Sequence, residues 1–446
     1  MVIVFVLTGV AALAVLGGLH WYAWLRLVRD TTAGPGVARR VGAVLFVAGP
    51  LSMFGAVASE RAGAPFWLQR VLAWPGFLWM ALAIYLVLAL LAGEFVRPVA
   101  RRVMERRTAL PPAPAAGGEP ESPRSVRPRS GEESADSEAE GVDGPSGAGG
   151  QSGASSSVGS AGAGRPPSSA GDPSRRLFVS RVVGGAAAAA AVGTVGYGTY
   201  GVLRGPRVKR VTVPLAKLPR SAHGFRIAVV SDIHLGPVLG RGFAQKVVDT
   251  INSTQPDLIA VVGDLVDGSV KDLGPAAAPL ARLRARHGAY FVTGNHEYFS
   301  GAEQWVQEVR ELGIHPLENA RTEMAGFDLA GVNDVQGESE GQGPDFGKAL
   351  GDRDTARACV LLAHQPVQIH EAVRYGVDLQ LSGHTHGGQL WPGNFIAAAA
   401  NPTVAGLERY GDTQLYVSRG AGAWGPPTRV GAPSDITVVE LASGQA

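Results

Sequence analysis

The sequence is poor in cysteine and in charged side chains. Its 446 residues include a single cysteine, Cys359, so an internal disulfide and a metal site built from several thiolates are both excluded. Charged residues make up 17% of the chain, whereas soluble globular proteins average about 25%. With 46% hydrophobic residues, this deficit indicates membrane-spanning segments. Any metal site must use histidine, aspartate, glutamate or asparagine.

Three long stretches without charged residues lie near the N-terminus. They span residues 2–19, 41–58 and 71–93, and each approaches the roughly 20 apolar residues that cross a bilayer. A helix that packs on a soluble core keeps a polar face, and none of these stretches has one. We therefore predict a membrane region over residues 1–96 with three transmembrane helices.

A segment without hydrophobic periodicity follows over residues 97–174. It is dominated by glycine, serine, proline and alanine, which cannot bury enough apolar surface to offset the entropy of ordering, so we predict a disordered linker. Arg175 and Arg176 then precede an uncharged stretch over residues 182–203. We predict that residues 175–204 form a twin-arginine-like signal and a fourth transmembrane helix. The alanine-rich composition of this segment leaves cleavage open.

Arginines are distributed unevenly around these stretches. Four follow the first stretch and five follow the third, which places both of these segments in the cytoplasm by the positive-inside rule. The fourth span would then carry the rest of the chain out of the cytoplasm, in a multi-pass protein of the cell membrane. Arg204, Arg207, Lys209 and Arg210 oppose this orientation because they follow the fourth span directly. A cytoplasmic location of the C-terminal domain is therefore the alternative.

The remaining chain, residues 205–446, has the pattern of a mixed α/β domain. Strand-like runs lie at residues 225–230, 258–262, 290–293, 358–363, 378–381 and 415–418. Helical patterns lie at residues 243–252, 276–286 and 302–312. This alternation is typical of layered α/β folds. Polar residues follow the first five runs directly, and because ligands bind at the carboxyl ends of strands in such sheets, we expect them to meet at one rim.

The five polar segments contain side chains that bind divalent metals. In chain order they are Asp232-x-His234, Gly263-Asp264-x-x-Asp267, Gly294-Asn295-His296-Glu297, His364 and Gly383-His384-x-His386. Imidazole nitrogens with carboxylate and amide oxygens suit manganese, iron or zinc. Two such ions can hold a hydroxide and clamp a phosphoryl group for in-line attack. Each segment alone is commoner as a turn or a hydrogen-bonded histidine, but the five together indicate a metal site.

The set and order of these motifs resemble those of the calcineurin-like metallophosphoesterase family. The resemblance covers about residues 208–440 and implies a four-layer αββα sandwich, preceded here by the transmembrane helices. It implies a hydrolase, a binuclear metal-dependent phosphoesterase, with two divalent ions. The first ion would be held by Asp232, His234, Asp264 and His386. The second would be held by Asp264, Asn295, His364 and His384, with Asp264 as the bridge.

The resemblance also assigns roles to two further residues. His296 is the expected catalytic residue, which stabilises or protonates the leaving-group oxygen. Asp267 is expected to support a ligand histidine without binding metal itself. Residues 387–392 and 418–422 resemble the bacterial, membrane-associated branch of the family, some members of which are exported by the twin-arginine route.

Together these features predict a membrane-tethered phosphoesterase that acts on phosphodiesters. Its partners would be the membrane and a phosphate-ester substrate, and closeness to the bilayer favours a lipid or envelope phosphodiester. The alternative is a non-catalytic membrane scaffold or sensor that retains the fold, although every expected ligand is present. No basic stripe with interleaved aromatics indicates a nucleic acid partner. The first three spans lack the internal charges that transporters often need.

Overall fold

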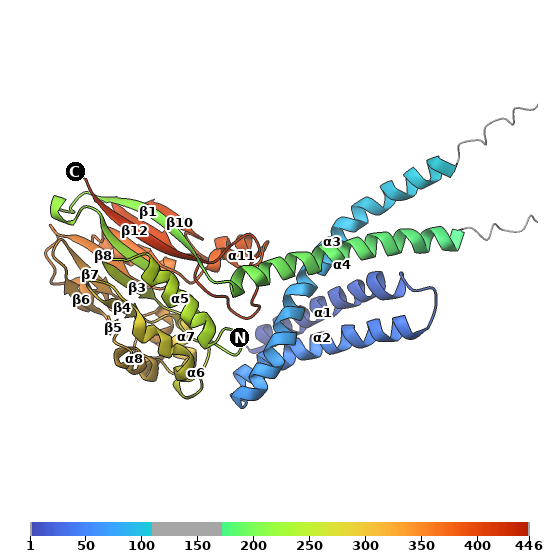
Figure 1. The fold of residues 1–446 in the computed structure, drawn as a ribbon, viewed down its shortest axis with the longest axis horizontal. Helices are drawn as coiled ribbons and strands as arrows, with labels where there is room; N and C mark the ends of the chain where they lie inside the picture. Colours follow the sequence, from blue (N-terminus) through green and yellow to red (C-terminus); the bar gives the residue numbers. More distant parts are fainter. Residues whose placement is uncertain (1, 109–171, 445–446) are drawn as a thin grey trace, which may run out of the picture.

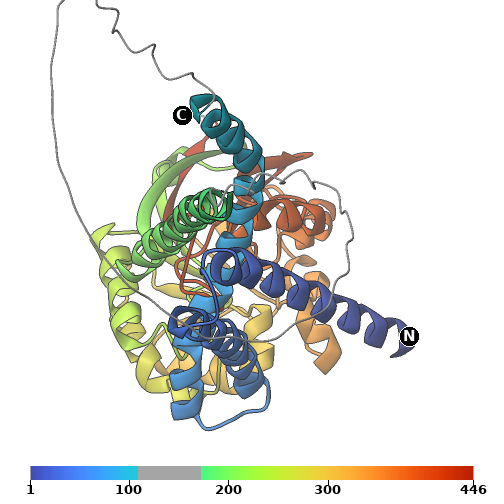
Figure 2. The same cartoon turned by 90° about the vertical axis from the view of Figure 1, so that its right-hand side faces the viewer.

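The computed structural model describes residues 2–108 and 172–444, which form a bundle of long helices beside an α/β sandwich (Figure 1). The last helix of the bundle leads into the first strand of the sandwich, and the view along the bundle shows the sandwich behind it (Figure 2). Residues 109–171, which make up most of the predicted linker, lie outside the described residues.

The bundle consists of α1 (Val2–Trp24), α2 (Val37–Arg61), α3 (Phe66–Thr108) and α4 (Asp172–Leu203). A short π-helix (Leu25–Arg29) extends α1. Among the described residues, four helical stretches are long and apolar enough to cross a membrane, one at each predicted position.

The helix α3 is longer than the sequence led us to expect. It continues to Thr108, so the predicted start of the linker at residue 97 falls inside a helix. Residues 97–108 are rich in arginine and also contain glutamate and methionine, which are good helix formers. These residues therefore extend the helix beyond its apolar stretch.

The helices α2 and α3 pack closely because small residues lie between them. A Cβ atom on Gly49 would lie 2.1 Å from the Trp79 ring, and one on Gly76 would lie 2.4 Å from the Ser52 carbonyl oxygen. Such close contacts between helices are characteristic of membrane bundles, where van der Waals packing rather than hydrophobic transfer drives association.

The sandwich contains two mixed six-stranded sheets. Sheet one comprises, in spatial order, β1 (Arg207–Leu215), β12 (Asp435–Ser443), β2 (Phe225–Val230), β3 (Leu258–Val262), β4 (Ala289–Val292) and β5 (His315–Pro316). Sheet two comprises β10 (Gly406–Tyr410), β11 (Thr413–Val417), β9 (Leu379–Ser382), β8 (Ala358–Leu362), β7 (Phe327–Gly331) and β6 (Ala320–Glu323).

The two sheets pack face to face around an apolar core. Ile227 and Val229 of sheet one and Leu329 and Leu381 of sheet two belong to the same buried cluster. Helices α5 (Arg241–Ser253), α6 (Val270–Ala277) and α8 (Ala302–Glu311) cover the outer face of sheet one. Helices α9 (Phe346–Leu350) and α10 (Ile369–Arg374) cover sheet two. The predicted four-layer α/β sandwich is confirmed.

The predicted strands and the polar segments behind them fall where we expected. Strands β2, β3 and β4 run parallel in sheet one, and β8 and β9 run parallel in sheet two. Their residues are buried on both faces, which explains the continuous runs of branched aliphatic residues. Each of the five strands ends two or three residues before one of the predicted site residues. A short helix, α7 (Asn295–Ser300), begins directly behind β4.

The bundle and the sandwich touch along loops that also border the strand ends. The Tyr85 hydroxyl of α3 donates a hydrogen bond to the Trp391 carbonyl oxygen (2.9 Å), and the hydroxyls of Thr199 in α4 and Thr428 are 2.7 Å apart. Phe66, at the start of α3, packs on the core between sheet one and its helices. The rim of the sandwich therefore faces the apolar helices.

Candidate metal centre

The predicted ligands lie on backbone that L-amino acids rarely adopt. Asp232, His234, Asp264, His384 and His386 all have φ between 49° and 71°, the left-handed region. Such strain is found where the surrounding structure fixes it, commonly at functional sites. Here the turns after β2, β3 and β9 point these side chains toward one another.

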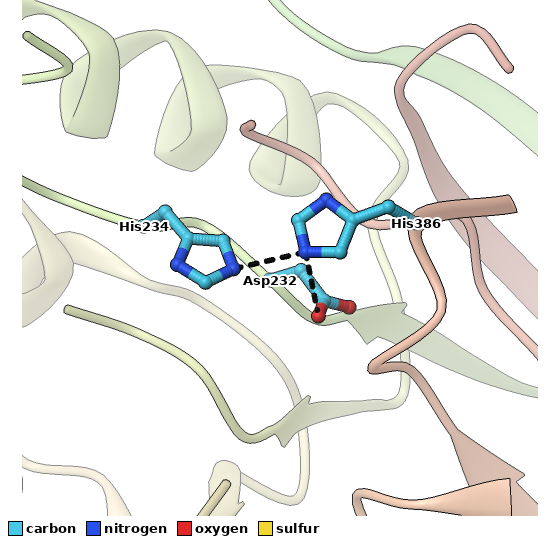
Figure 3. Close-up of side chains that lie close together, drawn as sticks. All are labelled: Asp232, His234 and His386. Atoms are coloured by element: carbon cyan, nitrogen blue, oxygen red, sulfur yellow. Dashed lines mark hydrogen bonds and ion pairs between the residues drawn. The ribbon is translucent and has the colours of Figure 1, made fainter. Parts of the chain in front are cut away.

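A first cluster gathers Asp232, His234 and His386 (Figure 3), all of them buried. The Nε2 atoms of the two histidines are 3.0 Å apart, and Nε2 of His386 lies 3.4 Å from Oδ1 of Asp232. Their potential ligand atoms all lie within 4.8 Å of one another, so a single ion could contact the three side chains.

A second cluster gathers Asp264, His364 and His384. Nε2 of His364 lies 3.2 Å from Oδ2 of Asp264, and Nδ1 of His384 lies 3.0 Å from Oδ1 of Asn295. The same Oδ2 of Asp264 is 3.8 Å from Nε2 of His234 in the first cluster. Asp264 therefore stands between the two clusters, where a bridging ligand is needed.

The hydrogen bond of the His364 ring fixes which of its nitrogens carries a hydrogen, and this arrangement suits a bound cation. Its Nδ1 lies 2.9 Å from the Val262 carbonyl oxygen, which can only accept, so Nδ1 carries the hydrogen. In neutral His364 the lone pair of Nε2 then faces the Asp264 carboxylate. This buried atom has no hydrogen-bond partner among the described residues. Only a proton or a cation between the two side chains relieves that repulsion.

Asp267 orients His234 in the same manner. Oδ1 of Asp267 accepts from Nδ1 of His234 (2.9 Å), which leaves the His234 Nε2 lone pair facing His386 and Asp264. Burial raises the pKa of Asp267, but the two histidines beside it outweigh burial and lower the pKa to about 2. A carboxylate that holds a ligand imidazole in this way is common at metal sites. The donor set therefore fits two divalent ions.

The charged groups of the two clusters shift one another's pKa. Burial raises the pKa of Asp264, but the charge of His364 lowers it well below its usual range. Burial lowers the pKa of His364, but Asp264 and Asp232 raise it well above its usual range. Burial and the neighbouring histidine charges lower the pKa of His384 to about 4 and that of His386 well below its usual range. These two imidazoles are therefore neutral in the absence of metal.

His296 lies at the edge of the clusters. Its Nδ1 is 2.7 Å from Oδ1 of Asp267, and its backbone N–H donates to Oδ1 of Asp264 (2.9 Å). Burial lowers the pKa of His296, but the hydrogen bond to Asp267 and its charge raise it to about 9. The structure thus brings all nine predicted site residues to one rim: Asp232, His234, Asp264, Asp267, Asn295, His296, His364, His384 and His386.

Glu297 is a site residue to which the sequence assigned no role. It is fully buried, and its carboxylate accepts from the backbone N–H groups of Asp264 (2.9 Å), Leu265 (2.7 Å) and Gly294 (2.6 Å). These bonds tie the turn after β3 to the turn after β4. Its place at the end of the Gly294-Asn295-His296-Glu297 motif was the sequence signal for it.

Arg429 is a second residue that the sequence did not single out. Its buried guanidinium donates to the carbonyl oxygens of Gly422 (2.6 Å) and His386 (3.0 Å), and Nη2 lies 3.1 Å from Nδ1 of His386. Because its backbone N–H also reaches the Gly198 carbonyl oxygen of α4 (3.4 Å), Arg429 connects a candidate ligand to the bundle. It lies in an irregular loop that no motif marks.

Comparison with known proteins is consistent with this geometry. A model of the calcineurin-like phosphoesterase family matches residues 225–388. A Danio rerio protein called "Transmembrane protein with metallophosphoesterase domain" is 39% identical over 259 residues, covering 55% of this chain and 59% of that protein. A solved dimetal phosphatase from Danio rerio aligns over 49% of this chain and 93% of its own, with 13% identity and a TM-score of 0.35.

A shorter relative is covered almost completely. An uncharacterized metallophosphoesterase of Aquifex aeolicus is 36% identical over 240 residues, which are 53% of this chain and 91% of that protein. The chain, by contrast, spans only 59% of the length of the zebrafish protein. The match that accounts for nearly a whole relative is decisive. This chain belongs to the calcineurin-like metallophosphoesterase family, whose members use divalent metals to hydrolyse phosphate esters.

Proposed function

We propose that this protein is a membrane-anchored phosphodiesterase with a binuclear metal centre. The observation that carries the proposal is the pair of ligand clusters with Asp264 between them. One ion would be held by Asp232, His234, Asp264 and His386, and the other by Asp264, Asn295, His364 and His384. When bound, two such ions supply positive charge to the phosphoryl oxygens and acidify the attacking water.

The chain's own residues supply orientation and a proton. Asp267 holds Nδ1 of both His234 and His296, so one carboxylate positions a ligand and the proton donor together. With Nδ1 of His296 bonded to Asp267, Nε2 is left to give its proton to the leaving oxygen. The raised pKa of His296 keeps the imidazole protonated at neutral pH, as a general acid requires.

We propose that the chain consists of four segments and that its catalytic site lies outside the cytoplasm. The segments are a membrane region (1–96), a linker (97–174) whose first residues continue α3, a twin-arginine-like signal that forms a fourth span (175–204), and a catalytic domain of the bacterial membrane-associated branch (205–446). Figure 1 shows the sandwich at the end of the bundle where α2 and α4 finish. The arginines that follow α1 lie at the other end, which the positive-inside rule places in the cytoplasm.

The test of the proposed chemistry is hydrolysis by the full chain. A chromogenic phosphodiester would be offered to purified protein with manganese, with a chelator, and with Asp264→Asn. The matched control is Asp412→Asn, an exposed carboxylate in the turn between β10 and β11. We expect turnover with manganese and with the control, and its loss with the chelator and with Asp264→Asn.

Three results would contradict the proposal in whole or in part. Activity that survives both the chelator and Asp264→Asn would exclude metal catalysis at this centre. A folded, metal-loaded protein that hydrolyses neither diesters nor monoesters would instead support the alternative of a non-catalytic scaffold. Hydrolysis of monoesters alone would be compatible with the metal centre but would exclude phosphodiesterase activity.

A further inference from the structure

An apolar helix without a covering partner borders the metal centre. Helix α11 (Gly393–Ala400) has the sequence Gly-Asn-Phe-Ile-Ala-Ala-Ala-Ala, and none of its residues is buried. Phe395 and Ile396 expose 66% and 77% of their surface. A contiguous apolar surface of this kind on a protein usually marks an interaction site.

The segment that leads into α11 is fixed to the helices of the bundle. Leu390 packs with Ala81 and Tyr85 of α3 and with Ala191 of α4 in one cluster. The Trp391 carbonyl oxygen accepts the hydrogen bond from the Tyr85 hydroxyl. Tyr85 lies inside the uncharged stretch of α3, at residues 71–93, which would occupy the bilayer. Thus α11 begins beside the membrane-spanning part of the molecule (Figure 1).

The same segment is built onto the candidate ligands. Gly388 follows His386 by two residues, and a Cβ atom there would lie 2.3 Å from the Asn394 backbone. Gln389 donates to the Trp424 carbonyl oxygen (2.9 Å) and accepts from the Trp424 N–H (3.0 Å). The loop that leads into α11 therefore connects the candidate ligand His386 to the bundle.

Two exposed aromatic rings lie beside the proposed proton donor, His296. Trp424 and Phe299 expose 56% and 66% of their surface, and their rings lie 5.6 Å and 5.5 Å from the His296 ring. Aromatic side chains are enriched where protein meets the interface between lipid and water. His296 thus lies between two such rings, on the rim that faces the bundle.

We propose that α11 enters the bilayer that holds α1 to α4, and that the site takes phosphate esters of lipid head groups. A lipid surface fits because α11 carries no charge and its loop is continuous with membrane-spanning helices. Its eight residues extend about 12 Å, enough to enter the acyl boundary but not to cross it. The insertion stands on the position of α11, whereas the substrate class rests on the proposed phosphodiesterase function.

Insertion can be measured without any enzyme activity. The full chain with Ile396→Cys would carry an environment-sensitive fluorophore in phosphatidylethanolamine–phosphatidylglycerol vesicles that contain nitroxide-labelled acyl chains. Native Cys359 is buried and burial raises the pKa of its thiol to about 12, so it should not compete for the label. Val373→Cys, on α10, is the matched control, and Val47→Cys, at an exposed position of the apolar helix α2, is the reference for contact with lipid.

We expect the lipid nitroxides to quench the label at residue 396 nearly as strongly as the label at residue 47, and to leave residue 373 unquenched. A label at residue 396 that behaves like the one at residue 373 overturns the insertion. A label that is shielded equally in detergent and in vesicles, without quenching, also overturns it, because a second protein copy would then cover α11.

The substrate class is tested by comparing two diesters in the same vesicles. Phe395→Ser/Ile396→Ser should lower release of the phosphorylated head group from vesicle lipid, relative to hydrolysis of a soluble chromogenic diester, by about tenfold or more. Val373→Ser should leave this ratio unchanged. Equal effects of the double variant on both diesters, or hydrolysis of the soluble diester with none of the lipid, overturns the lipid assignment. If the wild type hydrolyses neither diester, the proposed function itself fails, while the quenching result still decides the insertion.

Discussion

At the scale of single residues, the centre depends on side chains that hold the ligand turns rather than on ligands alone. The backbone of Asp264 lies in the left-handed region, with φ 53°. The Glu297 carboxylate stabilises this turn by accepting hydrogen bonds from the backbone N–H groups of Asp264 and Leu265. The sequence could indicate the ligands, because their residue types follow strand ends in a fixed order. It could not indicate the role of Glu297, nor Arg429 at all, because hydrogen bonds to backbone groups of other turns leave no pattern along the chain.

Glu297→Gln should destabilise the sandwich. An amide presents one acceptor oxygen where the carboxylate presents two, so at least one of the N–H groups of Asp264, Leu265 and Gly294 loses its partner, at a cost of about 1–3 kcal/mol. For a domain of this size we expect Tm to fall by at least about 2 °C. Glu303→Gln, an exposed position on α8, is the control. Equal melting temperatures for the two variants would contradict the role of Glu297.

The protonation of His296 predicts a pH dependence. Because its pKa is raised from 6.5 to about 9, the acid form is present below that value and is lost as pH rises through it. We expect kcat to fall at high pH with an apparent pKa at or below about 9, since bound cations can only lower it. His296→Gln should lower kcat by about 10²–10⁴-fold and remove the falling limb. His370→Gln, on the exposed face of α10, should keep both the wild-type kcat and the falling limb of the pH profile. An unchanged pH profile in His296→Gln would exclude His296 as the acid.

At the scale of elements, the sequence pattern identified six of the twelve strands in the described residues, β2, β3, β4, β8, β9 and β11, and placed one helix poorly. The apolar pattern at residues 276–286 predicts a helix, but α6 begins at Val270 and ends at Ala277, and a 3₁₀-helix follows over Ala278–Arg282. Pro279 has no N–H to continue α6, which explains the change of helix type. Helix α11 escaped prediction because it is short and its apolar residues follow no amphipathic pattern.

The contact of α8 with sheet one should dominate the stability of that layer. Trp305 of α8 is fully buried, and its Nε1–H donates to the Gly268 carbonyl oxygen (2.9 Å). Trp305→Ala would leave a cavity and an unpaired carbonyl group, at a cost of about 3–5 kcal/mol. Thermal unfolding of the full chain should show a large fall in Tm, whereas Glu303→Ala on the same helix should change it little. A fall no larger than that of Glu303→Ala would show that α8 contributes little to the fold.

At the scale of the whole molecule, the bundle and the metal centre form one structure. Tyr85 and Trp391 are 306 positions apart in the chain, yet they share a hydrogen bond at the rim of the sandwich. The sequence predicted a membrane region and a catalytic domain separately. It could not predict the contact between the bundle and the sandwich, because residues 109–171, which connect them in sequence, carry no periodicity. The contacting loops of the sandwich are also irregular, so no pattern marks them. The position of Arg429 between α4 and His386 follows from this docking.

The most direct test of the central claim is a metal titration of the full chain. Protein stripped of metal would receive increasing manganese while bound ions per chain and the rate of phosphodiester hydrolysis are measured on the same samples. We predict that activity appears with the second ion, and that Asp264→Asn lowers both the number of ions bound and the rate. Full activity with one ion per chain, or two tightly bound ions in Asp264→Asn, would contradict a centre bridged by Asp264.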